Sequence, residues 1–302
     1  MLLIRYFDAP VENTRWLAMQ RIIFCMIALD CILLRLSHVG RYGLDGFNVA
    51  HWSAITFVPS PWFAGGLLVA TSIACCTAAF TLPRHPWLYW IAVFLHTASW
   101  FISLLDSYQH HVFLSLVLLC FAVGADPRVR PHHEQGRTRG SAPTRAQGYN
   151  LLLFTTGTLY FWTAISKMNA TWLSGAPLQI LAPSWMGHFS IIAPIVVGIE
   201  LLVAVIYWLI PLYKMPWGFV PVVFLHIGIE MMGLRIGWFS IYMIVIALMV
   251  WFPQWPHMPS LKLRWAFPIS LIFLIAVFLM SSVQHDYDRY IAGEQRRRDD
   301  LK

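Results

Sequence analysis

Long apolar runs separated by short polar segments make up most of the sequence. A bilayer core of about 30 Å is crossed by about 20 apolar residues in a helix. About nine runs approach this length, so the pattern predicts an all-α, polytopic membrane bundle with about eight or nine transmembrane helices. The predicted helices are residues 16–36, 61–82, 87–105, 110–125, 149–167, 190–213, 217–234, 238–252 and 265–282.

The polar segments between these runs predict the domain organisation. Residues 1–283 are expected to form one transmembrane domain, within which residues 126–148 form a polar cytoplasmic loop between two halves. Residues 284–302 follow as a charged tail. Residues 168–189 are rich in Trp, Gly and Pro, and we expect them at the membrane interface, where Trp side chains concentrate. No cleavable signal peptide and no internal repeat are evident.

The composition excludes two broad classes of protein. Hydrophobic residues make up 58% of the chain and charged residues 12%, whereas roughly 25% are charged in an ordinary soluble domain. A soluble cytosolic enzyme is therefore excluded, and the apolar content also excludes a disordered chain. All five cysteines lie in apolar runs, where they are expected to serve as packing residues.

The net charge is +7, and the basic residues behind it lie mostly in loops between the apolar runs. This distribution is typical of a membrane protein whose loops orient it in the bilayer, and not of a protein with a nucleic-acid-binding face. With nine helices, most loop Lys and Arg residues fall on the side of the N-terminus. The positive-inside rule then places the N-terminus in the cytoplasm and the chain in the plasma (inner) membrane. With nine helices the basic tail would lie outside, which conflicts with the positive-inside rule. Either the number of helices is even, or the tail has little influence on topology.

Four charged residues interrupt the apolar runs. They are Arg21, Asp30 and Arg35 in the first run and Glu200 in the middle of residues 190–213. Charges at membrane depth face the bundle interior and are candidates for function. Buried ion pairs that fix helix packing are the favoured alternative, with Glu200 as a partner for one arginine.

A second polar set lies near the ends of its runs. His110 and His111 follow Asp106, and adjacent helical residues point about 100° apart, so only one histidine faces the core fully. His226 and Glu230 are spaced i and i+4 and share a helix face. No His-Glu-x-x-His pattern accompanies them, so no metal site is expected.

Lys167 ends the run at residues 149–167, on the predicted outer side, where lysine is disfavoured. Its side chain either extends to the interface or points inward among aromatic residues. In the second case loss of hydration favours the neutral amine, which is what a general base needs. Lys167, Trp172 and the polar set above all fall near one membrane face, which predicts one pocket open to the outside or the outer leaflet.

Four motifs in order resemble the HTTM (horizontally transferred transmembrane) domain family, which includes the membrane part of vitamin K-dependent gamma-carboxylase. The motifs are Arg21…Asp30…Arg35 with Arg41-Tyr42-Gly43-Leu44-Asp45-Gly46, Asp106…His110-His111-Val112-Phe113-Leu114, Tyr160-Phe161…Lys167…Ala170…Trp172-Leu173…Gly175, and His226…Ile236-Gly237-Trp238-Phe239. The resemblance implies a reduced naphthoquinone of the vitamin K or menaquinone type as cofactor. It also implies Lys167 as general base, His111 on the quinone oxygen and His226 lining the same pocket.

Departures from the carboxylase change the expected activity. Ser166-Lys167 and His110-His111 stand where the carboxylase has Lys-Lys and Asn-His. We also expect no counterpart of the carboxylase's large lumenal domain after the last predicted helix. The sequence is more similar to bacterial proteins of the sporulation-delaying protein B type, which mature an exported peptide with a small partner. We therefore expect a membrane enzyme that acts at the outer face on a small exported peptide, together with an accessory protein. A non-catalytic accessory factor for peptide maturation or export, and a transporter, are the alternatives.

Overall fold

The computed structural model describes residues 10–11, 13–41, 59–82, 84–102, 109–125, 144–145, 147–181, 187–211, 213, 215, 217–231 and 238–251. The predicted helix at residues 265–282, the boundary at residue 283, the tail and Asp106 lie outside these residues. The same holds for most of the predicted loop at residues 126–148.

Helices account for nearly all of the described chain. They are α2 (Asn13–Leu29), the π-helix η1 (Asp30–Arg35), the 3-10 helix η2 (Leu36–Arg41), α3 (Pro61–Thr81), α4 (Trp87–Phe101), α5 (Gln109–Ala125), α6 (Gln147–Lys167), α7 (Ala170–Leu173), α8 (Ala176–Leu181), α9 (Phe189–Leu209), α10 (Phe219–Met231) and α11 (Trp238–Trp251). Two short strands, β1 (Pro10–Val11) and β2 (Thr144–Arg145), pair antiparallel. The predicted all-α fold is confirmed for these residues.

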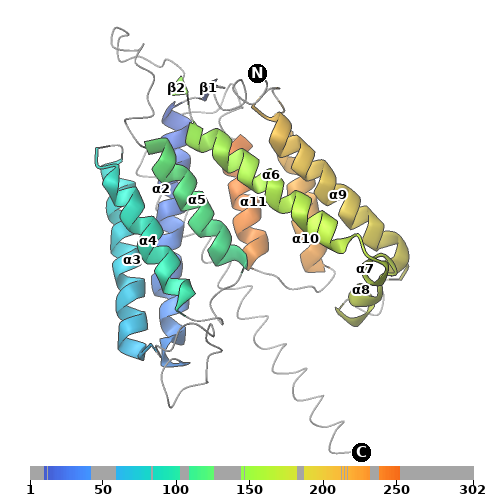
Figure 1. The fold of residues 1–302 in the computed structure, drawn as a ribbon, viewed down its shortest axis with the longest axis horizontal. Helices are drawn as coiled ribbons and strands as arrows, with labels where there is room; N and C mark the ends of the chain where they lie inside the picture. Colours follow the sequence, from blue (N-terminus) through green and yellow to red (C-terminus); the bar gives the residue numbers. More distant parts are fainter. Residues whose placement is uncertain are drawn as a thin grey trace, which may run out of the picture.

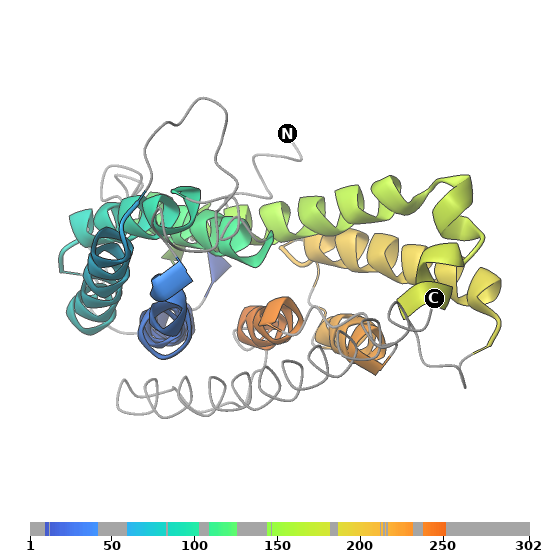
Figure 2. The same cartoon turned by 90° about the horizontal axis from the view of Figure 1, so that it is seen from below.

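The helices run side by side in one bundle (Figures 1 and 2). Helices α2 to α5 form one part of it, α6, α9 and α10 form the other, and α11 lies between α2 and α10. The β1–β2 pair lies at the top of Figure 1, where α2 and α6 begin, and α7 and α8 lie toward the bottom. Lys167, the last residue of α6, and η1, which follows α2, therefore lie toward the opposite end of the bundle from the strands.

Burial follows the pattern of a protein in lipid. Large apolar side chains are exposed on the outer helix faces, such as Phe94 on α4 at 71% and Phe224 on α10 at 66%. Asp30, Glu200 and His226 are buried inside the bundle. Three helical stretches, Trp16–Arg35, Pro61–Thr81 and Phe189–Leu209, are long and apolar enough to cross a membrane. The described residues thus confirm the predicted membrane-helix character.

A close crossing joins α5 to α6 near the strand end of the bundle. A Cβ built on Gly148 would lie 2.7 Å from the Cα of Gly124 and would also overlap the carbonyl oxygen of Cys120. Only glycine permits this backbone approach, so Gly148 fixes where α6 starts against α5.

The segment after α6 turns sharply and brings Trp172 back to Lys167. The Asn169 side chain caps α7 by accepting a hydrogen bond from the backbone N–H of Trp172 at 2.9 Å. Gly175 has a φ of 79°, a conformation that glycine adopts without a steric penalty. The segment predicted at the membrane interface is thus two short helices, α7 and α8, packed against α9.

Candidate functional site

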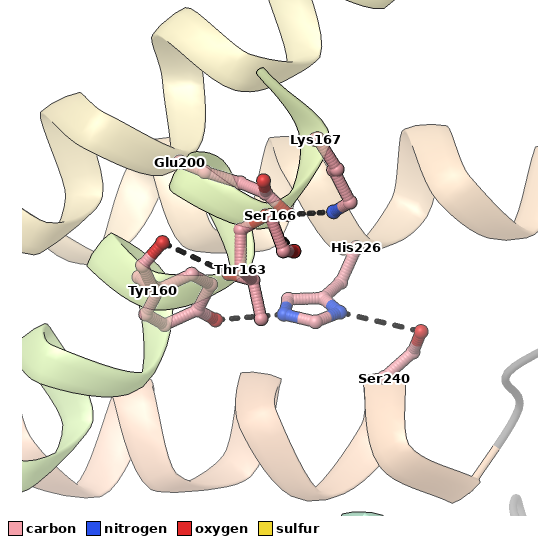
Figure 3. Close-up of polar contacts among 7 residues, drawn as sticks. All are labelled: Tyr160, Thr163, Ser166, Lys167, Glu200, His226 and Ser240. Atoms are coloured by element: carbon pink, nitrogen blue, oxygen red, sulfur yellow. Dashed lines mark hydrogen bonds and ion pairs between the residues drawn. The ribbon is translucent and has the colours of Figure 1, made fainter. Parts of the chain in front are cut away.

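Lys167 and Glu200 form an ion pair between α6 and α9 (Figure 3). The Glu200 side chain is 4% exposed and the Lys167 side chain 23%. The predicted pairing of Glu200 with an arginine is wrong, because α9 packs along α6 and not along α2. On α2, Arg21 instead donates a 3.4 Å hydrogen bond to the carbonyl oxygen of Leu82, which follows α3.

Two buried polar atoms flank this ion pair without a hydrogen-bond partner among the described residues. They are Oε2 of Glu200, an acceptor, and Nε1 of Trp172, a donor. The Lys167 ammonium lies 5.3 Å from the centroid of the Trp172 ring, within cation–π range. A buried polar group without a partner is costly, so these two atoms mark a place where a ligand can supply the missing hydrogen bonds.

His226 lies in a hydrogen-bonded chain beside the ion pair (Figure 3). Its Nε2 is 2.7 Å from the Tyr160 hydroxyl of α6, and its Nδ1 is 3.3 Å from the Ser240 hydroxyl of α11. Ser240 donates to Oε1 of Glu230 at 2.6 Å, so His226 and Glu230, one turn apart on α10, reach the same hydroxyl. Lys167 also acts electrostatically on His226. We call Tyr160, Lys167, Trp172, Glu200, His226, Glu230 and Ser240 the lysine cluster.

Aromatic rings surround the lysine cluster. Tyr160 stacks on Tyr207 of α9, with ring centroids 6.0 Å apart and an interplanar angle of 17°. His226 meets the edge of Phe239 with the ring centroids 5.8 Å apart. The polar groups are therefore enclosed by flat apolar surfaces, which suits a ligand with an aromatic body.

Arg35 belongs to a second polar cluster, between η1, α4, α5 and α11. Its Nη1 donates to the Ser99 hydroxyl at 2.9 Å and its Nη2 to the Ser99 carbonyl oxygen at 3.0 Å. Asp30 and Arg35 are the first and last residues of η1, a π-helix with i to i+5 backbone bonding. Both residues are buried, and neither carboxylate oxygen of Asp30 has a hydrogen-bond partner among the described residues.

Histidines extend this second cluster into α4 and α5. The Ser115 hydroxyl is 2.8 Å from Nδ1 of His96 and 2.9 Å from Nε1 of Trp100. His111 is buried, with its ring centroid 6.3 Å from that of His96. We call Asp30, Arg35, His96, Ser99, Trp100, His111, Ser115 and Tyr242 the arginine cluster. His111 thus lies in the arginine cluster, and the predicted single pocket divides into two clusters within the described residues.

Comparisons with family models, with curated proteins and with solved structures give no match to this chain. The resemblance to the HTTM domain family therefore stays a prediction from four ordered motifs. Because a fold by itself does not determine function, the side-chain chemistry of the two clusters carries the functional argument.

Sequence reasoning missed several residues that complete these clusters. Tyr160, Ser240, Ser99 and Ser115 are hydroxyl-bearing residues within apolar runs, and each bonds a group on another helix. One feature of the sequence could have pointed to these four residues. Each is expected at about the same depth in the membrane as a charged residue or a histidine. The side chains of Asp106 and His110 lie outside the described residues. In the part of the chain that the structure describes, no group of three or more His, Cys, Asp or Glu side chains is placed so that it could hold a metal ion.

Proposed function

We propose that this chain is an integral membrane enzyme of the HTTM type that takes a proton from a ligand bound beside Lys167. One observation carries the proposal: a lysine–carboxylate pair lies inside an apolar bundle, next to a buried acceptor and a buried donor that have no hydrogen-bond partner among the described residues. A purely structural pair would be expected to have its remaining polar atoms satisfied.

The ion pair supplies the proton chemistry. In the resting form Lys167 is an ammonium that donates a hydrogen bond to Glu200. Transfer of this proton to Glu200 gives a neutral amine and a neutral carboxylic acid, and an apolar surround lowers the cost of that neutral pair relative to two buried charges. The Lys167 amine then accepts a proton from the ligand. Glu200 is thus part of the proposed site, not only a packing charge.

The lysine cluster fits a reduced naphthoquinone. The rings of Trp172 and Tyr160 would hold the flat apolar body, Oε2 of Glu200 would accept a hydrogen bond from a hydroxyl, and the indole N–H would donate one. When bound, such a quinol supplies an ionisable hydroxyl and redox chemistry with oxygen. His111 lies beside His96 in the arginine cluster, and its contact with the quinone, which the resemblance implies, stays a prediction.

The proposal includes the wider setting predicted from the sequence. The chain crosses the plasma membrane with eight or nine helices, has its N-terminus in the cytoplasm, and is surrounded by lipid. A small exported peptide is the final substrate, and an accessory protein presents it. The distribution of basic loops supports this orientation, and the position of Lys167 at the bundle end opposite β1 and β2 supports access from the outer side.

Oxidation of reduced menaquinone by the protein purified in mild detergent tests the proposal. Lys167→Met is expected to abolish the reaction, because the group that accepts the proton is lost. Ser166→Ala is the matched control, since that exposed hydroxyl bonds only the Thr163 carbonyl oxygen of its own helix. Lys167→Met protein that inserts, stays folded and keeps the wild-type rate would overturn the proposal. Mass spectrometry of lipids and peptides that co-purify identifies the natural ligand.

A further inference from the structure

A buried chain of polar side chains links α6, α11 and α10 beside Lys167 (Figure 3). The contacts run from Tyr160 to His226, from His226 to Ser240, and from Ser240 to Glu230. Tyr160, His226 and Ser240 are all buried. Each link joins two different helices, so the chain depends on the folded bundle and not on local sequence.

Counting protons along the chain fixes which atom donates at each link. A serine hydroxyl carries one proton, and Ser240 directs it to Oε1 of Glu230 at 2.6 Å, a length typical of a bond to a carboxylate. Ser240 can therefore offer only lone pairs to His226, so Nδ1 of His226 must carry a hydrogen to bond it.

The other ring nitrogen then has a defined role. A neutral imidazole has one N–H, so protonation at Nδ1 leaves Nε2 as an acceptor. Nε2 lies 2.7 Å from the Tyr160 hydroxyl, which must donate its single proton to the ring. The Tyr160 oxygen keeps only lone pairs for any other neighbour.

We propose that Glu230 and Ser240 are positioning residues that hold His226 in its Nδ1–H form, so that Tyr160 presents an acceptor oxygen to a ligand beside Lys167. Among the described residues, the polar side chains that contact His226 are Tyr160 from α6 and Ser240 from α11, and Glu230 from its own helix α10 bonds Ser240. Glu230 on α10 and Ser240 on α11 thus set the ring orientation and the proton position of His226.

This arrangement narrows the class of ligand, a step that rests on the proposed function. Tyr160 and Lys167 are seven residues apart and share one face of α6, and Glu200 pairs with Lys167 on that face. The Tyr160 oxygen and Oε2 of Glu200 are therefore two acceptors on the same side of α6. Two acceptors attract a hydroxyl or N–H donor and repel a carboxylate. The lysine cluster therefore takes a neutral ligand with such a donor, while an acidic side chain of a peptide does not bind between Tyr160 and Glu200.

The proton position is measured by nuclear magnetic resonance on ¹⁵N-histidine-labelled protein in detergent micelles. His226→Gln identifies the signals of His226. The wild-type ring is expected to give a protonated Nδ1 and a bare Nε2. Ser240→Ala removes the acceptor from Nδ1, so the ring is expected to change to the Nε2–H form, whereas Ser240→Thr retains the hydroxyl and the wild-type pattern. A wild-type ring protonated at Nε2 or at both nitrogens overturns the proposal, whether or not the Ser240 variants fold.

The class of ligand that binds is tested separately, through the quenching of tryptophan fluorescence by three probes. They are 1-naphthol, its methyl ether and 1-naphthoate. The wild-type protein is expected to bind 1-naphthol about 2- to 10-fold more tightly than its methyl ether, the range of one net hydrogen bond, and to bind 1-naphthoate more weakly than either. In Tyr160→Phe the preference for naphthol is expected to shrink. Equal binding of naphthol and ether, or tightest binding of naphthoate, overturns the ligand class. If Lys167→Met keeps full activity while His226 shows the expected proton position, the proposed function fails and the role of Glu230 and Ser240 stands.

Discussion

Unequal burial of Lys167 and Glu200 predicts that the two halves of the ion pair contribute differently to stability. Lys167→Met leaves the Glu200 carboxylate, 4% exposed, without its partner. Removing one partner of a buried pair costs about 3–5 kcal/mol, because the remaining charge is buried and uncompensated. We expect this variant to lose about that much free energy of unfolding.

Glu200→Met is expected to be milder. It leaves an ammonium that is 23% exposed at the end of α6 and lies over the Trp172 ring. A lysine side chain at a helix end can extend to the interface, so we expect a loss of about 1 kcal/mol, in the range of an exposed pair. The double variant replaces both charges by apolar side chains of similar length, and such replacements are often neutral.

The assay is an unfolding titration of each variant in mixed micelles of dodecyl maltoside and sodium dodecyl sulfate, followed by tryptophan fluorescence. The expected order of stability places the double variant above Lys167→Met, with a coupling free energy of about 3 kcal/mol or more between the two sites. Additive losses in the double variant, or equal losses in the two single variants, would refute the reasoning that a buried, uncompensated carboxylate is the main cost.

Three further predictions concern packing and orientation. Ser115→Ala removes a hydroxyl that three side chains of α4 share, and we expect a loss of about 2 kcal/mol in the same titration, because buried polar groups are left unsatisfied. Gly148→Ala forces a Cβ into the backbone of α5 and should cost about 2 kcal/mol or more, whereas Gly198→Ala, with open space at its Cβ position, should change stability by less than about 1 kcal/mol. In cells, a membrane-impermeant thiol reagent should label Thr171→Cys from outside and Arg84→Cys only after permeabilisation; the reverse pattern would overturn the predicted orientation.

The positions of the helices could be predicted from the sequence because the start and end of a helix depend on residues that are close together in the chain. Ser60 caps α3 through the backbone N–H of Phe63, and Pro61 is its first residue, so the start of the predicted run at residue 61 coincides with the start of the helix. The high apolar content of the chain is enough to predict a helical bundle whose outer faces are apolar.

The pairing of side chains between helices did not follow from the sequence. The partner of Glu200 depends on whether α9 packs against α6 or α2, and apolar helices carry little information about their neighbours. The π-helix at Asp30–Arg35 gives these two residues a relative orientation that an ordinary α-helix would not. Serine hydroxyls such as Ser240 have no distinctive sequence context, although one of them determines how His226 is bonded.

The first turns of α11 connect the two polar clusters. Ser240 bonds the His226 and Glu230 side chains of the lysine cluster, and Tyr242, two residues later, acts on Asp30 of the arginine cluster. Residues spaced i and i+2 on a helix point about 200° apart, so one turn of α11 faces both clusters at once. A rotation of α11 would therefore move Ser240 relative to His226 and Tyr242 relative to the arginine cluster at the same time. The bonding of His226 beside Lys167 thus depends on a helix whose opposite face packs in the arginine cluster.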